Sequence, residues 1–159
     1  MRRSPEAVAP PTPVRAPERG APPTLRSYAA VISACKLAGA SALATSLLRE
    51  MDARGLRPNV VAWTAAIGAC EQHGEWERSL ELLNEMEAAG VKPNAITLRS
   101  VALACAPGGH WEHALAVVRG MAARGIKPSV GSYNAVLTAM RRAGEWTRAL
   151  SLVREMVDP

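Results

Sequence analysis

The chain repeats its own pattern every 35 residues, and this period constrains the fold more than any other feature. Glycine, proline, cysteine and methionine follow it in five columns: Gly39, Gly74, Gly109 and Gly144; Gly55, Gly90 and Gly125; Pro58, Pro93 and Pro128; Cys35, Cys70 and Cys105; and Met51, Met86, Met121 and Met156. Such a period predicts stacked units that each contact only their neighbours, rather than one globular core. The units fall at 25–59, 60–94, 95–129 and 130–159, the last ending five residues short of a full period.

Each unit carries two amphipathic helical patterns. In the second unit, apolar residues stand at i, i+3, i+4 and i+7 from Trp63 to Cys70, and another pattern runs from Trp76 to Met86. Gly74 lies between them, where a helix-to-helix turn favours a residue that accepts positive φ. A single helix pair cannot bury its apolar faces, whereas a stack of pairs can. The sequence therefore predicts an all-α fold, a right-handed α-solenoid of about four helix-turn-helix repeats whose first helices line one concave surface.

The first 24 residues differ in composition from the rest of the chain. They contain seven of the 12 prolines, together with Arg2, Arg3, Arg15 and Arg19. Proline restricts its own φ and biases the preceding residue toward extended backbone. We expect residues 1–24 to form a disordered Pro/Arg-rich arm, which serves either as an organellar transit peptide or as a plain linker.

Composition excludes two classes of protein. The longest uncharged stretches, 58–70 and 128–140, have 13 residues each, fewer than the roughly 18 that a membrane-spanning helix needs. The three cysteines are an odd number, and no pair has CxxC spacing, so a disulfide framework is not expected. A soluble protein of a reducing compartment, without a membrane partner, fits these observations.

A resemblance to the plain 35-residue pentatricopeptide repeat is carried in the second unit by Val60-Val61-Ala62-Trp63-Thr64, Gly74, Leu82-Leu83-Asn84-Glu85-Met86 and Gly90-Val91-Lys92-Pro93-Asn94. It extends over residues 25–159. The resemblance implies binding of single-stranded RNA in mitochondria or chloroplasts, with one base recognised per repeat. It also implies a role in organellar RNA processing, stability, translation or editing.

A tetratricopeptide-like scaffold for protein–protein interaction is the alternative. Tetratricopeptide repeats are also helix pairs, with a period of about 34 residues and a glycine inside the first helix. Here the period is 35 in every column, and the glycine falls between the helices. Both readings describe a binding protein rather than an enzyme.

The resemblance implies that two positions per unit recognise a base: the residue after the aromatic position of the first helix and the residue after the closing proline. These are Ala29 with Asn59, Thr64 with Asn94, Arg99 with Ser129, and Asn134 alone. Thr64 with Asn94 resembles the family's adenine combination, since hydroxyl and amide together donate and accept as that edge requires. Asn134 resembles the choice for pyrimidines, while Ala29 and Arg99 depart from the pattern. Alternatively, Thr64 and Asn94 only start a helix and cap a turn.

The family also holds each base between aliphatic side chains two residues before the aromatic position. Only Val61 and Ile96 fit, because the other units carry Arg26 and Gly131 there. The second unit is therefore predicted to contain the best-formed pocket. Candidate phosphate contacts near the ends of the first helices are Lys36, Arg141 and Arg142, which could instead interact with the helix dipole. Because the glutamates of the second unit lie mostly in its second helix, we expect an acidic outer face.

No catalytic residue, metal or cofactor is expected. His110-Trp111-Glu112 matches the HxE triplet of zinc deaminases, but no cysteine follows Cys105 to complete such a site. A zinc site built from Cys70 and the nearby histidines is also rejected, because Cys70 belongs to an apolar column. The tryptophans of the second helices are assigned to the core rather than to base stacking; they are Trp76, Trp111 and Trp146.

Two local features predict further details. The segment Pro107-Gly108-Gly109 predicts that the first helix of the third unit stops by about Ala106, because proline removes a helix hydrogen bond. The face after Met156 lacks the polar residues that cap a stack. We therefore expect partners beyond RNA, namely further repeats, another copy of the chain or a catalytic partner protein.

Overall fold

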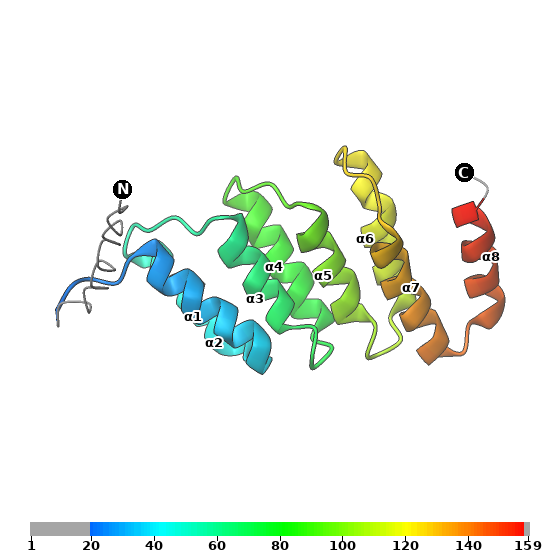
Figure 1. Cartoon of the computed structure of the whole chain (residues 1–159), viewed down its shortest axis with the longest axis horizontal. Coiled ribbons are helices and arrows are strands. Elements are labelled where there is room, and N and C mark those ends of the chain that lie inside the picture. Colours follow the sequence, from blue (N-terminus) through cyan, green and yellow to red (C-terminus); the bar gives the residue numbers. More distant parts are fainter. Residues whose placement is uncertain (1–19, 158–159) are drawn as a thin grey trace, which may run out of the picture.

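A computed structural model describes residues 20–157, so residues 1–19 of the predicted arm lie outside the described range. Within that range the chain forms eight helices that stack as pairs along one axis (Figure 1). They are α1 (Leu25–Ala38), α2 (Ser41–Ala53), α3 (Val60–Ala69), α4 (Trp76–Ala88), α5 (Ala95–Cys105), α6 (Trp111–Ala123), α7 (Val130–Ala143) and α8 (Trp146–Val157). The prediction of an all-α stack of four helix-turn-helix repeats is confirmed. None of these helices combines the length and the apolar character that crossing a bilayer requires.

Every first helix begins at the first residue of its predicted unit, because the residue before it is a helix cap. The side-chain oxygens of these caps accept a hydrogen bond from the backbone N–H three residues later; the caps are Thr24, Asn59, Asn94 and Ser129. At the other end, Gly39 and Gly144 close α1 and α7 in the left-handed region, with φ of 67° and 76°. A residue without Cβ adopts this conformation at little cost.

The helices form two layers. Each first helix packs on the next one, α1 on α3, α3 on α5 and α5 on α7, whereas α2, α4 and α6 each pack between their own first helix and the following one, and α8 packs on α7. The core lies between these layers and contains side chains with no exposed surface, such as Ile67 and Leu98, and the methionine column at Met51, Met86 and Met121. The stack therefore presents one continuous surface made of first helices only.

The first helix of the third unit ends at Cys105, which confirms the prediction made from Pro107. Proline is not the only cause, because α3 ends at Ala69, one position earlier in its own unit, without any proline. Pro107 has a packing role as well. A Cβ built on Gly74 would lie 2.8 Å from the Cβ of Pro107, so the turn of the second unit contacts the turn of the third.

The tryptophan column is only partly core. The ring of Trp76 contacts those of His110 and His113 in tilted arrangements, at centroid distances of 4.7 and 4.3 Å. The guanidinium of Arg148 lies 4.6 Å from the ring centroid of Trp111. Trp146, in contrast, is 73% exposed. Each tryptophan is covered by the second helix of the following unit, and Trp146 is the one that no described helix follows.

The cysteines are buried, as their column predicts, and this determines their reactivity. Burial raises the pKa of the Cys70 thiol to about 12, with a further contribution from Glu75, and raises that of Cys105 to about 11. Because the thiolate is the nucleophile, we expect iodoacetamide at pH 8 to leave Cys70 and Cys105 unmodified in the folded protein and to label both in denaturant. Mass spectrometry after a timed reaction measures this, and rapid labelling of the folded protein would contradict it.

Candidate nucleic-acid interface

The first helices carry positive charge only. In α1, α3, α5 and α7 the charged residues are Arg26, Lys36, Arg99, Arg141 and Arg142. The acidic residues of the eight helices all belong to the second helices; they are Glu50, Asp52, Glu77, Glu81, Glu85, Glu87, Glu112 and Glu155. A surface of one sign attracts ligands of the opposite sign and accelerates their encounter. The first-helix surface is thus electrostatically suited to a polyanion.

One cavity on this surface brings together most of the residues predicted for the second unit. It has a volume of about 270 Å³. Its lining comes from α1, α3 and the start of α5, and consists of Ser33, Lys36, Val60, Val61, Thr64, Ala65, Asn94 and Ile96. Val61 and Ile96 are 57% and 63% exposed, so both offer apolar surface to a ligand in this cavity.

A hydrogen-bond chain at the floor of this cavity fixes its donors and acceptors. The Oδ1 atom of Asn94 accepts from the Thr97 backbone N–H at 2.9 Å and from the Thr97 hydroxyl at 3.0 Å. The Thr97 hydroxyl also lies 2.7 Å from that of Thr64. Because the Thr97 proton is already donated to Asn94, the Thr64 hydroxyl is the donor in this pair.

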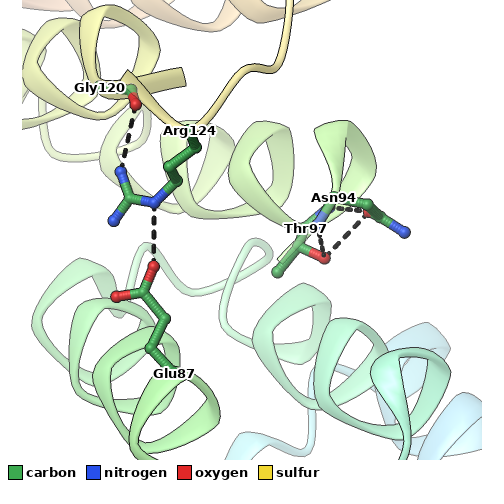
Figure 2. A network of polar contacts seen from close by, with 5 residues as sticks. All are labelled: Glu87, Asn94, Thr97, Gly120 and Arg124. Atoms are coloured by element: carbon green, nitrogen blue, oxygen red, sulfur yellow. Dashed lines mark hydrogen bonds and ion pairs between the residues drawn. The ribbon is translucent and has the colours of Figure 1, made fainter. Parts of the chain in front are cut away.

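Two hydrogen-bonding groups at this cavity therefore remain free, one an acceptor and the other a donor. Thr64 Oγ1 retains lone pairs that can accept, and Asn94 Nδ2 retains N–H groups that can donate. Figure 2 shows the Asn94 nitrogen pointing away from Thr97. The helix-cap role of Asn94 uses only its oxygen, so capping and ligand contact are compatible in one side chain.

Thr97 was not among the residues singled out from the sequence. It is buried with no exposed surface, and it connects the two residues that were. A signal exists in the sequence, since an Asn followed three residues later by a hydroxyl residue forms a reciprocal cap. The hydroxyl contact with Thr64, 33 residues away, depends on how α3 and α5 pack and has no such signal.

The remaining predicted residues occupy less enclosed positions. Asn59 and Ser129 cap α3 and α7 with their side-chain oxygens, at 3.0 and 3.3 Å from the backbone nitrogens that they bind. Ala29 is half-buried on α1, and Asn134 is exposed on α7. Arg99 is exposed on α5 and lies beside Gly131, where a Cβ would be 3.2 Å from its Nε.

The phosphate candidates separate into two groups. Lys36 lines the second-unit cavity, and its side chain crosses Gly68 so closely that a Cβ there would be 2.7 Å from its Cε. Arg141 and Arg142 lie in the last turn of α7, and Arg142 donates to the carbonyl of Pro107 at 3.4 Å. Only Lys36 stands beside a cavity that contains predicted base contacts.

A larger cavity, of about 460 Å³, lies away from this surface, at the loops after α4 and α6. Its charged residues include Glu87 and Arg124, which pair with each other at 2.9 Å; Arg124 also donates to the Gly120 carbonyl at 3.3 Å (Figure 2). Because these polar groups are already satisfied, volume alone does not make this the better candidate site. Within residues 20–157, no group of three His, Cys, Asp or Glu side chains is arranged to hold a metal ion.

Stacked helix pairs with one basic surface define an α-helical repeat protein. Three family models match the chain: PPR repeat at residues 26–56, PPR repeat family at 58–107 and pentatricopeptide repeat domain at 116–158. The chain belongs to the pentatricopeptide repeat family, as its 35-residue period indicates. A comparison with curated protein sequences gives no match.

Solved structures of this family share the fold. The pentatricopeptide repeat protein PPR10 in complex with an 18-nt psaJ RNA element is 36% identical, with a TM-score of 0.76 over 86% of this chain and 20% of that chain. PPR10 from maize aligns with a TM-score of 0.74 at 23% identity, over 87% of this chain and 20% of that chain. The PPR domain of Arabidopsis thaliana protein-only RNase P 1, in complex with tRNA, gives 0.68 at 23% identity, over 80% and 67% of the two chains. The chain spans about a fifth of the length of PPR10.

Proposed function

We propose that this protein binds single-stranded RNA on its first-helix surface, with one base per repeat and no catalytic step of its own. The observation that carries the proposal is the second-unit cavity, where an acceptor and a donor stand between two exposed aliphatic side chains on a surface free of acidic helix residues. PPR10, the relative at 36% identity, was solved with bound RNA, which supports the same reading. We further propose that the protein acts in organellar RNA processing, stability, translation or editing, in a mitochondrion or chloroplast.

The binding mode in the second unit follows from the cavity. A base enters between Val61 and Ile96, which cover its two faces. Adenine suits the floor, because its N6 amino group can donate to Thr64 Oγ1 while its N1 accepts from Asn94 Nδ2. Lys36, at the same cavity, neutralises a neighbouring phosphate.

Salt dependence separates RNA binding from a scaffold function. Each neutralised phosphate of a single strand contributes about −0.7 to the slope of log K against log salt. We expect fluorescence anisotropy with labelled decamer RNAs to give affinities that fall as salt rises from about 50 to 200 mM. A protein that binds a peptide but no RNA at about 100 mM salt would instead be a tetratricopeptide-like scaffold. Sequencing of the RNA that copurifies from cells would then identify the target.

Lys36→Gln tests the phosphate contact. We expect weaker binding to all RNA sequences and a salt slope reduced by about 0.7, because one phosphate is no longer neutralised. The matched control is Arg49→Gln, which removes the same charge from α2, where the Arg49 side chain is 73% exposed on a second helix. Equal effects of the two substitutions would show that only net charge matters and would contradict a local contact.

The exposed face of α8 points to a protein partner as well. Trp146, Leu150, Val153 and Val157 are exposed there by 42% to 73%, and Trp76 and Trp111, the counterparts of the first, are covered by the next unit. We propose that this face packs against a further repeat, either in a longer product or in a second copy of the chain. Four units specify at most about 1 in 256 sequences at one base per repeat, so extra repeats would also supply specificity.

Light scattering across a range of concentrations tests this packing. We expect the chain to associate, and Trp146→Gln to shift it toward the monomer, because the ring would be buried at the contact. A wild-type chain that is strictly monomeric and binds one RNA sequence specifically would contradict the proposal.

A further inference from the structure

The third unit lacks one wall of the pocket that the second unit has. In the second unit, Val61 and Ile96 stand on either side of the cavity. The corresponding pair in the third unit is Ile96 and Gly131, and a glycine offers no side chain to cover a base. If only these two positions formed the walls, a base bound at the third unit would be uncovered on the side of Gly131.

Arg99 occupies the missing place. A Cβ built on Gly131 would lie 3.2 Å from Arg99 Nε, 3.4 Å from Cζ and 3.6 Å from Cδ. Because Nε, Cζ and Cδ are the nearest atoms, the side of the guanidinium rather than its terminal amino groups rests against Gly131. Arg99 is exposed, so its terminal N–H groups remain accessible on the first-helix surface. A Cβ at position 131 would push the Arg99 side chain away from its place by a few tenths of an ångström or more.

The stack itself produces this geometry. Lys36 of α1 lies across Gly68 of α3 in the same manner, and in both cases the glycine stands 32 positions after the cation. A long side chain on one first helix therefore reaches the next first helix when the residue there is glycine. Among the described residues, Arg99 has no ion-pair partner, so its position over Gly131 is not dictated by an acidic side chain.

We infer that the Arg99 guanidinium, lying across Gly131, is the second wall of the third unit, and that an RNA base of any identity stacks between it and Ile96. A guanidinium plane stacks on the π-face that every base has, so such contact tolerates all four bases. This inference rests on the proposed RNA binding and assigns a function to the unit whose residues depart from the adenine or pyrimidine pattern.

The test uses octamer RNAs of uridine with one central adenine, in which both neighbours of the adenine are varied together through the four bases. For the wild-type chain we expect affinities within about twofold of one another across the varied bases. Arg99→Lys keeps the charge but loses the planar guanidinium, so we expect it to weaken binding to all four RNAs about fivefold or more. Arg99→Tyr keeps a planar group, so we expect its affinities to stay within about twofold of wild type. The control is Arg119→Lys on α6, where the side chain is 64% exposed on a second helix, with no expected effect.

Two results would overturn the inference while leaving RNA binding intact. A guanine preference above about fivefold that disappears in Arg99→Lys would mean that the Arg99 guanidinium hydrogen-bonds the edge of guanine instead of stacking on a base. Wild-type affinity of Arg99→Lys would mean that the residue contacts only phosphate. If the wild-type chain binds none of these RNAs, the proposed function itself fails. Circular dichroism of each variant confirms that the helices are retained.

Discussion

Asn94→Asp should change the preferred base at the second unit from adenine to guanine. The cap on α5 is preserved, because one carboxylate oxygen can accept from the Thr97 backbone N–H as Asn94 Oδ1 does at 2.9 Å. The other oxygen replaces the Nδ2 donor by an acceptor. Together with Thr64 Oγ1 it offers two acceptors, which match the N1–H and N2–H donors of guanine, while adenine N1 loses its partner.

The expected switch is large enough to measure directly. Base discrimination by paired hydrogen bonds is worth roughly 1–3 kcal/mol in DNA readout, which corresponds to about fivefold or more in affinity. Four RNAs that differ at one position, titrated at fixed salt against both proteins, give the ratio of adenine to guanine affinity. The ratio is the decisive quantity, since the added negative charge weakens binding of all four RNAs alike.

Asn59→Asp is the matched control for this exchange. Asn59 caps α3 in the same way, with its Oδ1 3.0 Å from the Ala62 nitrogen. Its partner position is Ala29, which has no hydroxyl to form the second contact. We expect this variant to keep the wild-type adenine preference. An unchanged preference in Asn94→Asp would instead assign Asn94 to capping alone.

Thr97→Val should reduce both stability and base discrimination. The substitution preserves shape but removes the hydroxyl that joins Thr64 to Asn94 inside a fully buried site. Loss of one partner of a buried hydrogen bond costs about 1–3 kcal/mol of unfolding free energy. The freed Thr64 hydroxyl can then donate or accept, so the preference for adenine over guanine should fall.

Urea unfolding and the same four RNAs measure the two effects. Thr138→Val is the control, because the Thr138 hydroxyl donates only to the Asn134 carbonyl of its own helix, at 2.8 Å. We expect that change to stay within about 0.5 kcal/mol. Thr97→Ser, which retains the hydroxyl, should recover the base preference. A Thr97→Val protein with undiminished adenine preference would remove Thr97 from the recognition mechanism.

The starts of the first helices depend on local chemistry that can be read from the sequence. The first helices begin at Leu25, Val60, Ala95 and Val130, where the predicted units begin. A capping side chain and a proline determine that position within a few residues of chain, and the 35-residue period repeats it. The pairing of Thr64 with Asn94 was implied by the family resemblance, and both residues line one cavity.

Contacts between neighbouring units could not be predicted from the sequence. The Thr64 to Thr97 hydrogen bond and the position of Arg99 over Gly131 both depend on how closely adjacent first helices approach. The early end of α3 has no proline to announce it. The exposure of Trp146 differs from that of Trp76 and Trp111 although the three share one column, since burial of each depends on the following unit.

The contacts of the tryptophan column determine which helices of the stack detach first in local unfolding. Trp76 and Trp111 each lie under a side chain from the next second helix, so α4 and α6 cannot detach without breaking a contact to a neighbour. The helix α8 has no such cover: it packs on α7 and contacts α6 through Arg148 and Glu155, and no described helix lies on its other side. In a stack whose stability is a sum of nearest-neighbour terms, a terminal helix exchanges its amide protons before an internal one. Asn134 lies on α7, next to this terminal helix, so it would contact RNA where local opening is most frequent. Thr64 and Asn94 lie in the interior of the stack, where local opening is least frequent.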